Sequence, residues 1–557
     1  MRRPDRTTLA LAGVLLGALA LRLWGIRYGL PFSYNADEAG HFVPLAVGFF
    51  GHGLDPHYFL NPPGYTELIA AVYAVWFRGR AAVEHAYAHD PTEVFLVARV
   101  TVAVLGTLAV WLLHLAGARL FDRRVGLLAA ALGAVAFLPV FYAHLALNDV
   151  PAMAAATLAL LGAALALRGR TMRGALLGGL AAGLAAGTKY TAGIVLLPVL
   201  TAIFVQARGQ RAPLIRTAVV PLAAACAAAL GGFLLANPYA LLDFHAFHAG
   251  VASQRELTSE ENLSKLGLTQ RSGIVYYLWS LTWGLGWIPA LAALGGAIHL
   301  TLRERGLALV LLPVPLLYVL YMGIQERYFG RWLLPVLPIA ILLAAYGGLE
   351  LARAVALRAP RLALPAVALV AVALLAQGLV TSLHDDRVLS RPDTRASARA
   401  WLLANVPAGA RVVVEPFVPT GWLGARLRLW DTTRADVDDF GRPLPAGSTR
   451  YVRVDKYERT LRPALIDRYV AQGYCWVITG SDQYARAFAQ PGVVPQAIAY
   501  YAALARRSAT VARFSPYRAG AKPPAFNFDW SFDYYPLAYA RPGPEIVVYR
   551  LRGGRCD

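Results

Sequence analysis

The sequence has few charged residues and few cysteines for its length. Only 15% of its 557 residues are charged and 57% are hydrophobic, whereas about a quarter of a typical soluble protein is charged. This composition argues against a soluble protein. Three cysteines are too few for a disulfide scaffold. Cys226 lies in an apolar run, whereas Cys475 and Cys556 could pair if their region is extracytoplasmic.

Lysine is also scarce, because four lysines stand against 49 arginines in a chain of net charge +20. Such a charge could indicate nucleic-acid binding or the basic cytoplasmic loops of a membrane protein. Most arginines of the first 360 residues lie in short loops between apolar runs, and the sequence lacks a basic groove motif interleaved with aromatic residues. We therefore predict a membrane protein that does not bind nucleic acid.

Apolar runs near the 20-residue length that crosses a bilayer follow one another through the first 383 residues. The basic N-terminus imitates a signal peptide, but the many later runs favour an uncleaved first helix. The run 64–77 has only 14 residues, which is short for a span and predicts a juxtamembrane or re-entrant helix. Ten further spans are predicted at 93–117, 125–146, 150–167, 174–188, 190–207, 213–235, 274–300, 306–322, 331–350 and 362–383.

The arginines also predict the orientation of the chain. If 64–77 does not span, five arginine-containing loops lie on the same side as the basic N-terminus, as the positive-inside rule requires. We therefore expect a mainly α, multi-pass protein of the plasma (inner) membrane with its N-terminus in the cytoplasm. Residues 1–383 form the membrane domain, in which 26–92 is a long external loop, and 384–557 form an extracytoplasmic α/β domain.

The external loop contains the sequence YNADEAGHF, in which Asp37 and Glu38 are adjacent and His41 follows one turn later. Adjacent side chains cannot both point at one atom, so we expect different roles for them. One could accept a proton from an attacking hydroxyl while the other fixes a neighbouring group or a metal. The alternative is a pair of solvated loop acids. Asp149, in HLALNDVPAM, is either a further functional acid or a helix cap.

Several basic residues lie where apolar runs meet the external side. Lys189 interrupts two runs and either snorkels to the interface or meets an anion, and Arg22 follows the same logic or pairs with a loop acid. Arg327, Tyr328 and Arg331 lie outside, against the usual charge bias. Because the arginine fork fits phosphate oxygens, this group predicts an anionic ligand at the membrane surface. A lipid phosphate that carries a reactive group would fit.

A second external loop opens with Asp243, His245 and His248. Two histidines three positions apart can share a helix face, but a third ligand is not evident. No cofactor is certain, and a divalent metal remains open. In the C-terminal region, the aromatic segment PAFNFDWSFDYYPLAYARPGPEI either stacks on a glycan acceptor or forms part of the domain core.

The order of these features resembles the GT-C glycosyltransferases, in particular the protein O-mannosyltransferase and lipid A aminoarabinose transferase branch that uses polyprenyl-phosphate sugars. The motifs that carry the resemblance extend over about 380 residues and are YNADEAGHF, NPPGYTELIAAVYAVWF, FDRRVGLLAAALGAVAFLPVFYAHLALNDVPAM, GTKYTAG and ERYFGRWLLPVLPIAILLAAYGG. The resemblance implies that Asp37 is the general base, that Glu38 supports the site and that Asp149 lies beside it.

The resemblance also implies the substrates and their ligands in the protein. Lys189 and Arg327, with Tyr328, would hold the phosphate of a polyprenyl-phosphate sugar donor, and Tyr190 is a further substrate-binding candidate. The sugar would pass in a single inverting displacement to a protein, lipid or glycan acceptor at the membrane.

The chain departs from the lipid A transferases at Asn61, which replaces the lysine of their Lys-Pro pair. That substrate is therefore not carried over, and we take Asn61, His41, Asp243 and Arg22 as further substrate-binding candidates. A lipid or solute transporter is the alternative function, but it should show internal repeats and polar residues near mid-membrane. A sensor or scaffold would leave Asp37, Lys189 and Arg327 unexplained.

Overall fold

The structure is a computed structural model that describes residues 5–210, 213–259, 272–325, 327–419, 421–438, 441–527 and 534–556. The chain forms two compact units, which are described separately. The first unit contains residues 1–26, 36–260 and 272–386, and the second contains residues 27–35 and 387–557.

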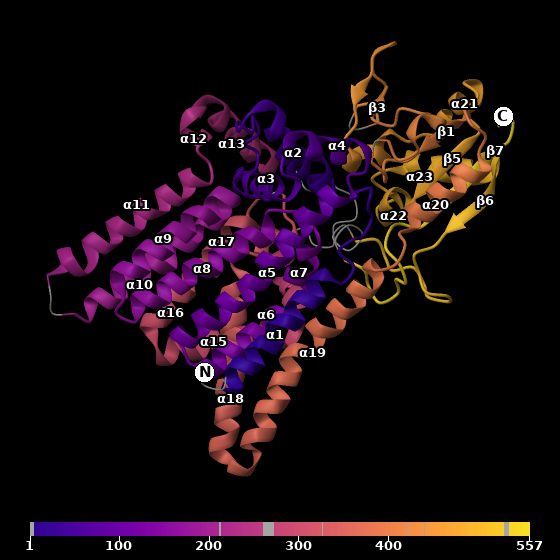
Figure 1. The fold of residues 1–557 in the computed structure, drawn as a ribbon. Coiled ribbons are helices and arrows are strands. Elements are labelled where there is room, and N and C mark those ends of the chain that lie inside the picture. Colours follow the sequence, from indigo (N-terminus) through magenta and orange to yellow (C-terminus); the bar gives the residue numbers. More distant parts are fainter. Residues whose placement is uncertain are drawn as a thin grey trace. The chain divides into compact units, whose positions relative to one another are not determined.

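The first unit is helical (Figure 1). Aspartates cap helices of this unit. Asp5 accepts a hydrogen bond from the Thr8 backbone N–H at the start of α1, and Asp122 accepts from the Arg124 and Val125 N–H groups at the start of α6. The helices are α1 (Arg6–Leu23), α2 (Val43–His52), α3 (Gly64–Phe77), α4 (Arg80–His89), α5 (Thr92–Leu120), α6 (Arg123–Val135), α7 (Phe137–Phe141), α8 (Asp149–Leu167), α9 (Thr171–Thr188), α10 (Leu196–Arg208), α11 (Val220–Leu235), α12 (Tyr239–Leu242), α13 (Phe244–Ser259), α14 (Gly273–Leu281), α15 (Trp287–Arg303), α16 (Arg305–Leu311), α17 (Pro313–Gly323), α18 (Leu337–Arg358) and α19 (Ala363–Leu389).

Nine helical segments among the described residues are long and apolar enough to cross a membrane, and a bent pair makes a tenth. The protein is therefore a multi-pass membrane protein of mainly α class, as the sequence predicts. The expected eleventh span is α9, which forms a helix but is not among these candidates; it contains five glycines, which add little hydrophobicity. The run 64–77 is helix α3, of 14 residues, as expected for a segment too short to span.

The bent pair is α6 and α7, whose axes meet at 58°. Pro139 lies in α7 and has no N–H, so the Val135 carbonyl cannot receive the helical hydrogen bond that a residue at that position would donate. The Ser382 hydroxyl donates to the Val135 carbonyl instead, at 3.0 Å. A side chain from α19 thus satisfies the carbonyl that the bend exposes.

Glycines bring α9 close to its neighbours α8 and α11, and Figure 1 shows these helices side by side. A Cβ on Gly183 would lie 2.0 Å from the Ala229 carbonyl oxygen of α11, and one on Gly162 of α8 would lie 2.3 Å from the Gly178 Cα. Such distances exclude any side chain at these positions. Close packing of small residues holds membrane helices together, and here it fixes the end of α9, after which Lys189 follows.

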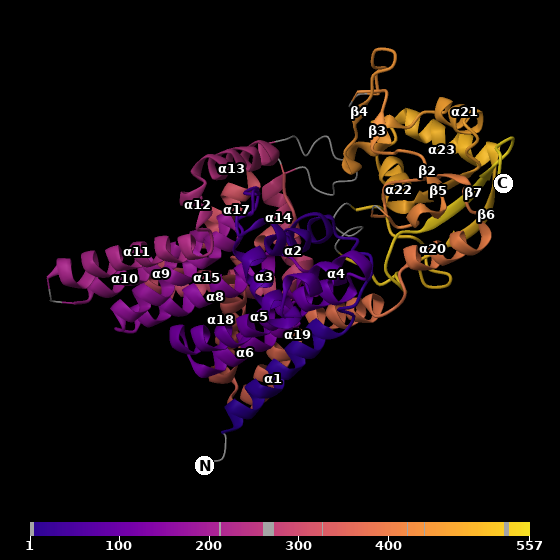
Figure 2. The same ribbon diagram turned by 45° about the horizontal axis from the view of Figure 1, so that its top comes forward.

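The second unit is built on a five-stranded sheet with the order β2-β1-β5-β7-β6, which Figure 2 shows beside its helices. β1 pairs in parallel with β2 and β5, and β7 is antiparallel to β5 and β6. The elements are α20 (Thr394–Asn405), β1 (Arg411–Val414), β2 (Arg428–Leu429), β3 (Arg434–Ala435), β4 (Arg450–Tyr451), η10 (Val454–Thr460), α21 (Ala464–Ala471), β5 (Trp476–Gly480), α22 (Ser481–Ala489), α23 (Pro495–Arg507), β6 (Ser508–Phe514) and β7 (Ile546–Leu551).

Two further sequence hypotheses concern this unit. Cys475, which precedes β5, and Cys556 form a disulfide with a Cα–Cα distance of 5.1 Å. In the aromatic segment, residues 528–533 lie outside the described residues, and Tyr535 and Tyr539 are buried with their rings 5.2 Å apart. These two tyrosines therefore belong to the core of the unit rather than to an exposed stacking surface.

Candidate active site

The two adjacent acids of YNADEAGHF point in different directions. Glu38 begins a single π-helical turn, η1 (Glu38–Phe42), and its carboxylate accepts two hydrogen bonds of 2.7 Å from the Arg99 guanidinium on α5. Both side chains are fully buried, and the Ala146 backbone N–H also donates to Glu38 at 2.9 Å. Asp37 precedes this turn and keeps 35% of its side chain exposed. Asp37 is therefore the member of the pair that a substrate can reach.

The carboxylate of Asp37 forms one end of an ionic network. The Arg331 guanidinium donates to Asp37 at 2.6 Å, and its Nε lies 3.9 Å from the carboxylate of Asp149. Asp149 also accepts a short hydrogen bond from the Lys189 ammonium group. We call Asp37, Arg331, Asp149 and Lys189 the ionic network. It alternates acid and base, and only Asp37 is more than 15% exposed.

Backbone contacts hold the network in place from several elements. Asp149 is the first residue of α8, and the side-chain amide of Asn148 before it donates to the Thr188 carbonyl at the end of α9. This bond ties the Asp149 and Lys189 segments together. Arg331 lies in a 3-10 turn, η7 (Gly330–Leu333), where the Tyr318 hydroxyl of α17 donates to the Trp332 carbonyl at 2.6 Å.

The network sets the protonation state of Asp37. Burial by itself raises the pKa of this carboxyl, but the charge and hydrogen bond of Arg331, with smaller contributions from His41 and Arg327, bring the pKa below its usual value. Asp37 is therefore a carboxylate at neutral pH. A partly exposed carboxylate can accept a proton from a hydroxyl group that reaches it.

Other predicted site residues line the approach to Asp37. The rings of His41 and Tyr58 stack at 5.1 Å, and the side-chain amide of Asn61 donates to the Tyr58 hydroxyl at 3.2 Å. The negative charge of Asp37 contributes to the raised pKa of Tyr58, after the larger effect of burial. Tyr190 donates its hydroxyl to the Phe59 carbonyl at 3.0 Å. His41, Asn61 and Tyr190 thus contact one segment, residues 58–61.

The residues predicted as one basic group at 327–331 have different surroundings in the structure. The guanidinium groups of Arg327 and Arg331 both lie over the ring of Phe329, at 5.4 and 5.1 Å from its centre. Tyr328 points the other way, is only 3% exposed and packs against Tyr276 at 4.4 Å. Arg327 lies with the network, whereas Tyr328 supports α14 from within.

Arg22 and Asp243 lie in other surroundings. Arg22 is fully buried in α1 and donates three hydrogen bonds to backbone carbonyls, those of Ala18, Gly133 and Ala134. It therefore joins α1 to α6. Asp243 caps the start of α13, where its carboxylate accepts from the Ala246 N–H at 3.1 Å.

Asp243 also belongs to a group that could hold a metal ion. Ligand atoms of Asp55, His57 and Asp243 all lie within 4.8 Å of one another, a spacing that oxygen and imidazole ligands of one divalent ion can adopt. The sequence suggested His245 and His248 as partners of Asp243, but the structure brings Asp55 and His57 to it instead. The partners come from the loop before α3, which no spacing in the sequence connects to α13.

Sequence reasoning missed Arg99, the buried partner of Glu38. It lies within the apolar run 93–117, where an arginine is costly unless it is paired. That cost was a usable signal. Arg331 was recognised as part of a basic group, but its contact with Asp37 spans 294 positions and leaves no trace in local spacing.

Comparisons with known proteins bear on this site. Residues 92–235 match the family model described as dolichyl-phosphate-mannose-protein mannosyltransferase, a stretch that includes Asp149 and Lys189. No curated protein matches the sequence. Among solved structures, the apo oligosaccharyltransferase of Archaeoglobus fulgidus is similar with a TM-score of 0.54 and 14% identity, over 89% of this chain and 72% of that chain. The chain has the GT-C fold.

One further structure supports this fold, and another is less similar. The oligosaccharyltransferase AglB of Archaeoglobus fulgidus, in complex with an inhibitory peptide and a dolichol-phosphate, has a TM-score of 0.52 and 13% identity over 92% of this chain and 73% of that chain. ArnT from Cupriavidus metallidurans, bound to undecaprenyl phosphate, has a TM-score of 0.48 and 16% identity over 86% of this chain and 94% of that chain. The two Archaeoglobus fulgidus structures confirm the GT-C resemblance drawn from the sequence, and the matched family model and these structures describe glycosyltransferases.

Proposed function

We propose that the protein is a membrane glycosyltransferase that moves a sugar from a polyprenyl-phosphate donor to a hydroxyl acceptor, with Asp37 as the general base. The observation that carries this proposal is the ionic network: a reachable carboxylate contacts a cation that is itself held beside a second acid and a lysine. The support for the donor class is the GT-C fold, since AglB, which shares it, binds dolichol-phosphate.

The reaction would be a single displacement with inversion at the anomeric carbon. The acceptor oxygen forms a bond to that carbon while its proton passes to the exposed carboxylate oxygen of Asp37. The bond between the anomeric carbon and the donor phosphate oxygen breaks, and its electron pair stays on the oxygen. Polyprenyl phosphate therefore leaves with one more negative charge than it carried as a diester.

The cations of the network would stabilise that departing charge. Arg331 and Lys189 are 14% and 11% exposed, so water screens them weakly and their attraction to an anion is correspondingly strong. Arg331 also contacts Asp37. A phosphate that draws Arg331 toward itself would weaken this contact and make Asp37 a stronger base at the moment when the acceptor needs one.

Glu38 would act as a positioning residue rather than as a second base. Its buried pair with Arg99 fixes η1 against α5, and η1 begins one residue after Asp37. Asp149 would hold Lys189 and Arg331 together in the absence of donor. Tyr328 and Arg22 would have structural roles, because one packs in the interior and the other binds helix carbonyls.

The reaction would take place on the extracytoplasmic side of the plasma (inner) membrane. The arginine-containing loops favour a cytoplasmic N-terminus. Because the eleven expected spans are an odd number, the C-terminal unit would then lie on the opposite, extracytoplasmic side. The disulfide in that unit also supports this side. A lipid-linked donor needs no soluble nucleotide there.

We further infer that a divalent ion could bind Asp55, His57 and Asp243. These residues fit such an ion because they supply two carboxylates and one imidazole within reach of a single point. The test is the melting temperature of the purified protein in chelator and in Zn²⁺ or Mn²⁺. We expect the ions to raise it, and the effect to vanish in Asp243→Asn. Equal melting temperatures in all conditions would exclude the ion.

The proposed activity is tested by incubating the purified protein with synthetic polyprenyl-phosphate sugars and envelope acceptors while release of polyprenyl phosphate is measured. We expect release to depend on both substrates. Lys189→Ala should weaken donor binding at least tenfold, whereas Lys456→Ala in the second unit should leave it unchanged. Transport of the intact donor across vesicles without release would favour a flippase and contradict the proposal.

A further inference from the structure

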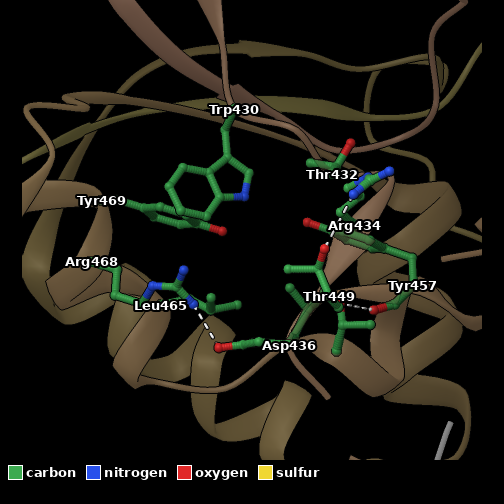
Figure 3. Close-up of a pocket in the computed structure, with 12 residues that line it drawn as sticks. Trp430, Thr432, Arg434, Asp436, Thr449, Tyr457, Leu465, Arg468 and Tyr469 are labelled. Atoms are coloured by element: carbon green, nitrogen blue, oxygen red, sulfur yellow. Dashed lines mark hydrogen bonds and ion pairs between the residues drawn. The ribbon is translucent and has the colours of Figure 1, made fainter. Parts of the chain in front are cut away.

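A hollow of about 470 Å³, open solvent at its mouth included, lies entirely within the second unit. Trp430 forms one side, Tyr469 and Arg468 come from α21, and Tyr457 comes from η10, as Figure 3 shows. Nothing in the proposed transfer reaction uses these residues, so the hollow needs its own explanation.

The wall of the hollow combines aromatic rings with an apolar floor. The rings of Trp430 and Tyr469 meet nearly edge to face, with centres 4.9 Å apart, and the floor contains the buried residues Leu461 and Leu465. Trp430 remains partly exposed. An aromatic face carries partial negative charge, which attracts the partly positive C–H groups on the face of a sugar ring.

A buried hydroxyl without a partner points into this space. Tyr457 is only 3% exposed, and its hydroxyl forms no hydrogen bond with any residue that the structure describes. Figure 3 shows this hydroxyl directed toward the interior of the hollow, opposite Tyr469. A buried polar group without a partner destabilises the folded protein, and a ligand hydroxyl could supply the missing hydrogen bond. The rim adds the hydroxyls of Thr432 and Thr449.

The rim of the hollow has an excess of positive charge. Asp436 already binds two arginines, Arg462 at 2.5 Å and Arg468 at 2.9 Å. Arg434 lines the same rim and donates to the Thr449 hydroxyl at 3.3 Å, and it forms no ion pair with the part of the chain that the structure describes. Two arginines, Arg434 and Arg468, therefore line the hollow together with one carboxylate, Asp436, which also binds Arg462 outside the lining. This balance favours a ligand with a negative charge.

We propose that this hollow binds an acidic saccharide, that is, a sugar ring with a carboxylate or phosphate substituent. The ring packs against Trp430, a ring hydroxyl bonds to Tyr457, and the anionic substituent meets Arg434. That this saccharide belongs to the acceptor rests on the proposed function. The binding itself does not, because it depends only on residues of the second unit.

The test measures binding to the full-length protein in lipid nanodiscs by saturation-transfer NMR and calorimetry, without donor. The probes are a uronic acid disaccharide, the neutral disaccharide of the same linkage, and inorganic phosphate. We expect the acidic disaccharide to bind at least tenfold more tightly than the neutral one. Trp430→Ala and Arg434→Ala should each weaken it at least tenfold, and Tyr457→Phe about threefold or more because one hydrogen bond is lost.

Matched controls separate the site from the fold. Arg428→Ala removes an exposed arginine on β2, and Tyr500→Phe removes a buried hydroxyl of the same core outside the hollow, so both should bind as the wild type does. Tyr457→Phe keeps the ring and remains informative if Trp430→Ala does not fold. Equal affinity for acidic and neutral sugars, binding of phosphate alone, or unchanged binding in the Tyr457 and Arg434 variants would overturn the proposal. Because no turnover is measured, these failures would leave the transferase proposal standing.

Discussion

The Arg331 guanidinium lies 2.6 Å from the carboxylate of Asp37 and 3.9 Å from that of Asp149. One side chain therefore connects the reachable acid to the buried acid that holds Lys189. This arrangement gives Arg331 two tasks, since it keeps Asp37 ionised in the free protein and offers a cation to an incoming phosphate. The first task has a measurable consequence for the dependence of the rate on pH.

Arg331→Ala should move the acid side of the pH–rate profile to higher pH. Burial raises the pKa of Asp37, and Arg331 is the main influence that lowers it. In the wild type the pKa lies below its usual value, so protonation of Asp37 should not reduce kcat/KM until the pH falls below about 4. Without Arg331 the loss should begin at higher pH. The control is Arg353→Ala, which breaks an ion pair with Asp122 elsewhere in the protein. If the acid side of the pH–rate profile does not move in Arg331→Ala, the pairing of Arg331 with Asp37 is contradicted.

Breaking the buried pair of Glu38 and Arg99 should destabilise the membrane unit. Both side chains are fully buried, so removing one charge leaves the other uncompensated, at a cost of about 3–5 kcal/mol. Glu38→Gln or Arg99→Met should lower the melting temperature strongly, and the double variant should recover much of the loss. If the two single variants melt like the wild type, Glu38 does not hold η1 as proposed.

Glu415 should make the second unit less stable as pH rises. Burial raises the pKa of this carboxyl to about 8 although Tyr501 and the Gly480 N–H bond to it. The folded state thus keeps a proton that the unfolded chain loses near pH 4.3. The contribution of Glu415 to stability is therefore fully present below about pH 4.3. It decreases as the pH rises toward about 8 and then levels off.

Hydrogen exchange of strands β1 and β5 between pH 5 and 9 measures this effect. Glu415→Gln should reduce this pH dependence, whereas Asp467→Asn, at an exposed site on α21, should not. The remainder is expected from Glu458, because burial raises its pKa to about 7. Stability that is flat with pH in the wild type would show that Glu415 ionises without cost.

The disulfide makes a prediction about sidedness. In intact cells, thiol reagents should leave Cys475 and Cys556 unmodified because the two are joined, and both should react after reduction and unfolding. The disulfide closes a loop between residues 81 positions apart. Its loss should lower the free energy of unfolding by roughly 2–5 kcal/mol, so Cys556→Ser should melt at a lower temperature. Three free thiols in freshly isolated membranes would place the second unit in a reducing compartment.

Local patterns predicted the helices well and the contacts between them poorly. Hydropathy and length located the apolar helices and showed that 64–77 is too short to span, because these properties belong to continuous segments. The divergence of Asp37 and Glu38 also followed from their adjacency. The partners of the two acids could not be predicted in this way, because Arg331 in η7 and Arg99 in α5 are distant from them in the sequence. The grouping of Asp243 with Asp55 and His57 was hidden for the same reason.

The central claim is that Asp37 accepts the proton of the acceptor, and turnover by Asp37→Asn tests it most directly. This variant keeps the shape of the side chain but removes its charge. Release of polyprenyl phosphate should fall by at least a thousandfold, while donor affinity, measured separately, should change less than tenfold. Asp90→Asn, at an exposed acid between α4 and α5, should retain full activity. Turnover by Asp37→Asn at the wild-type rate would contradict the account.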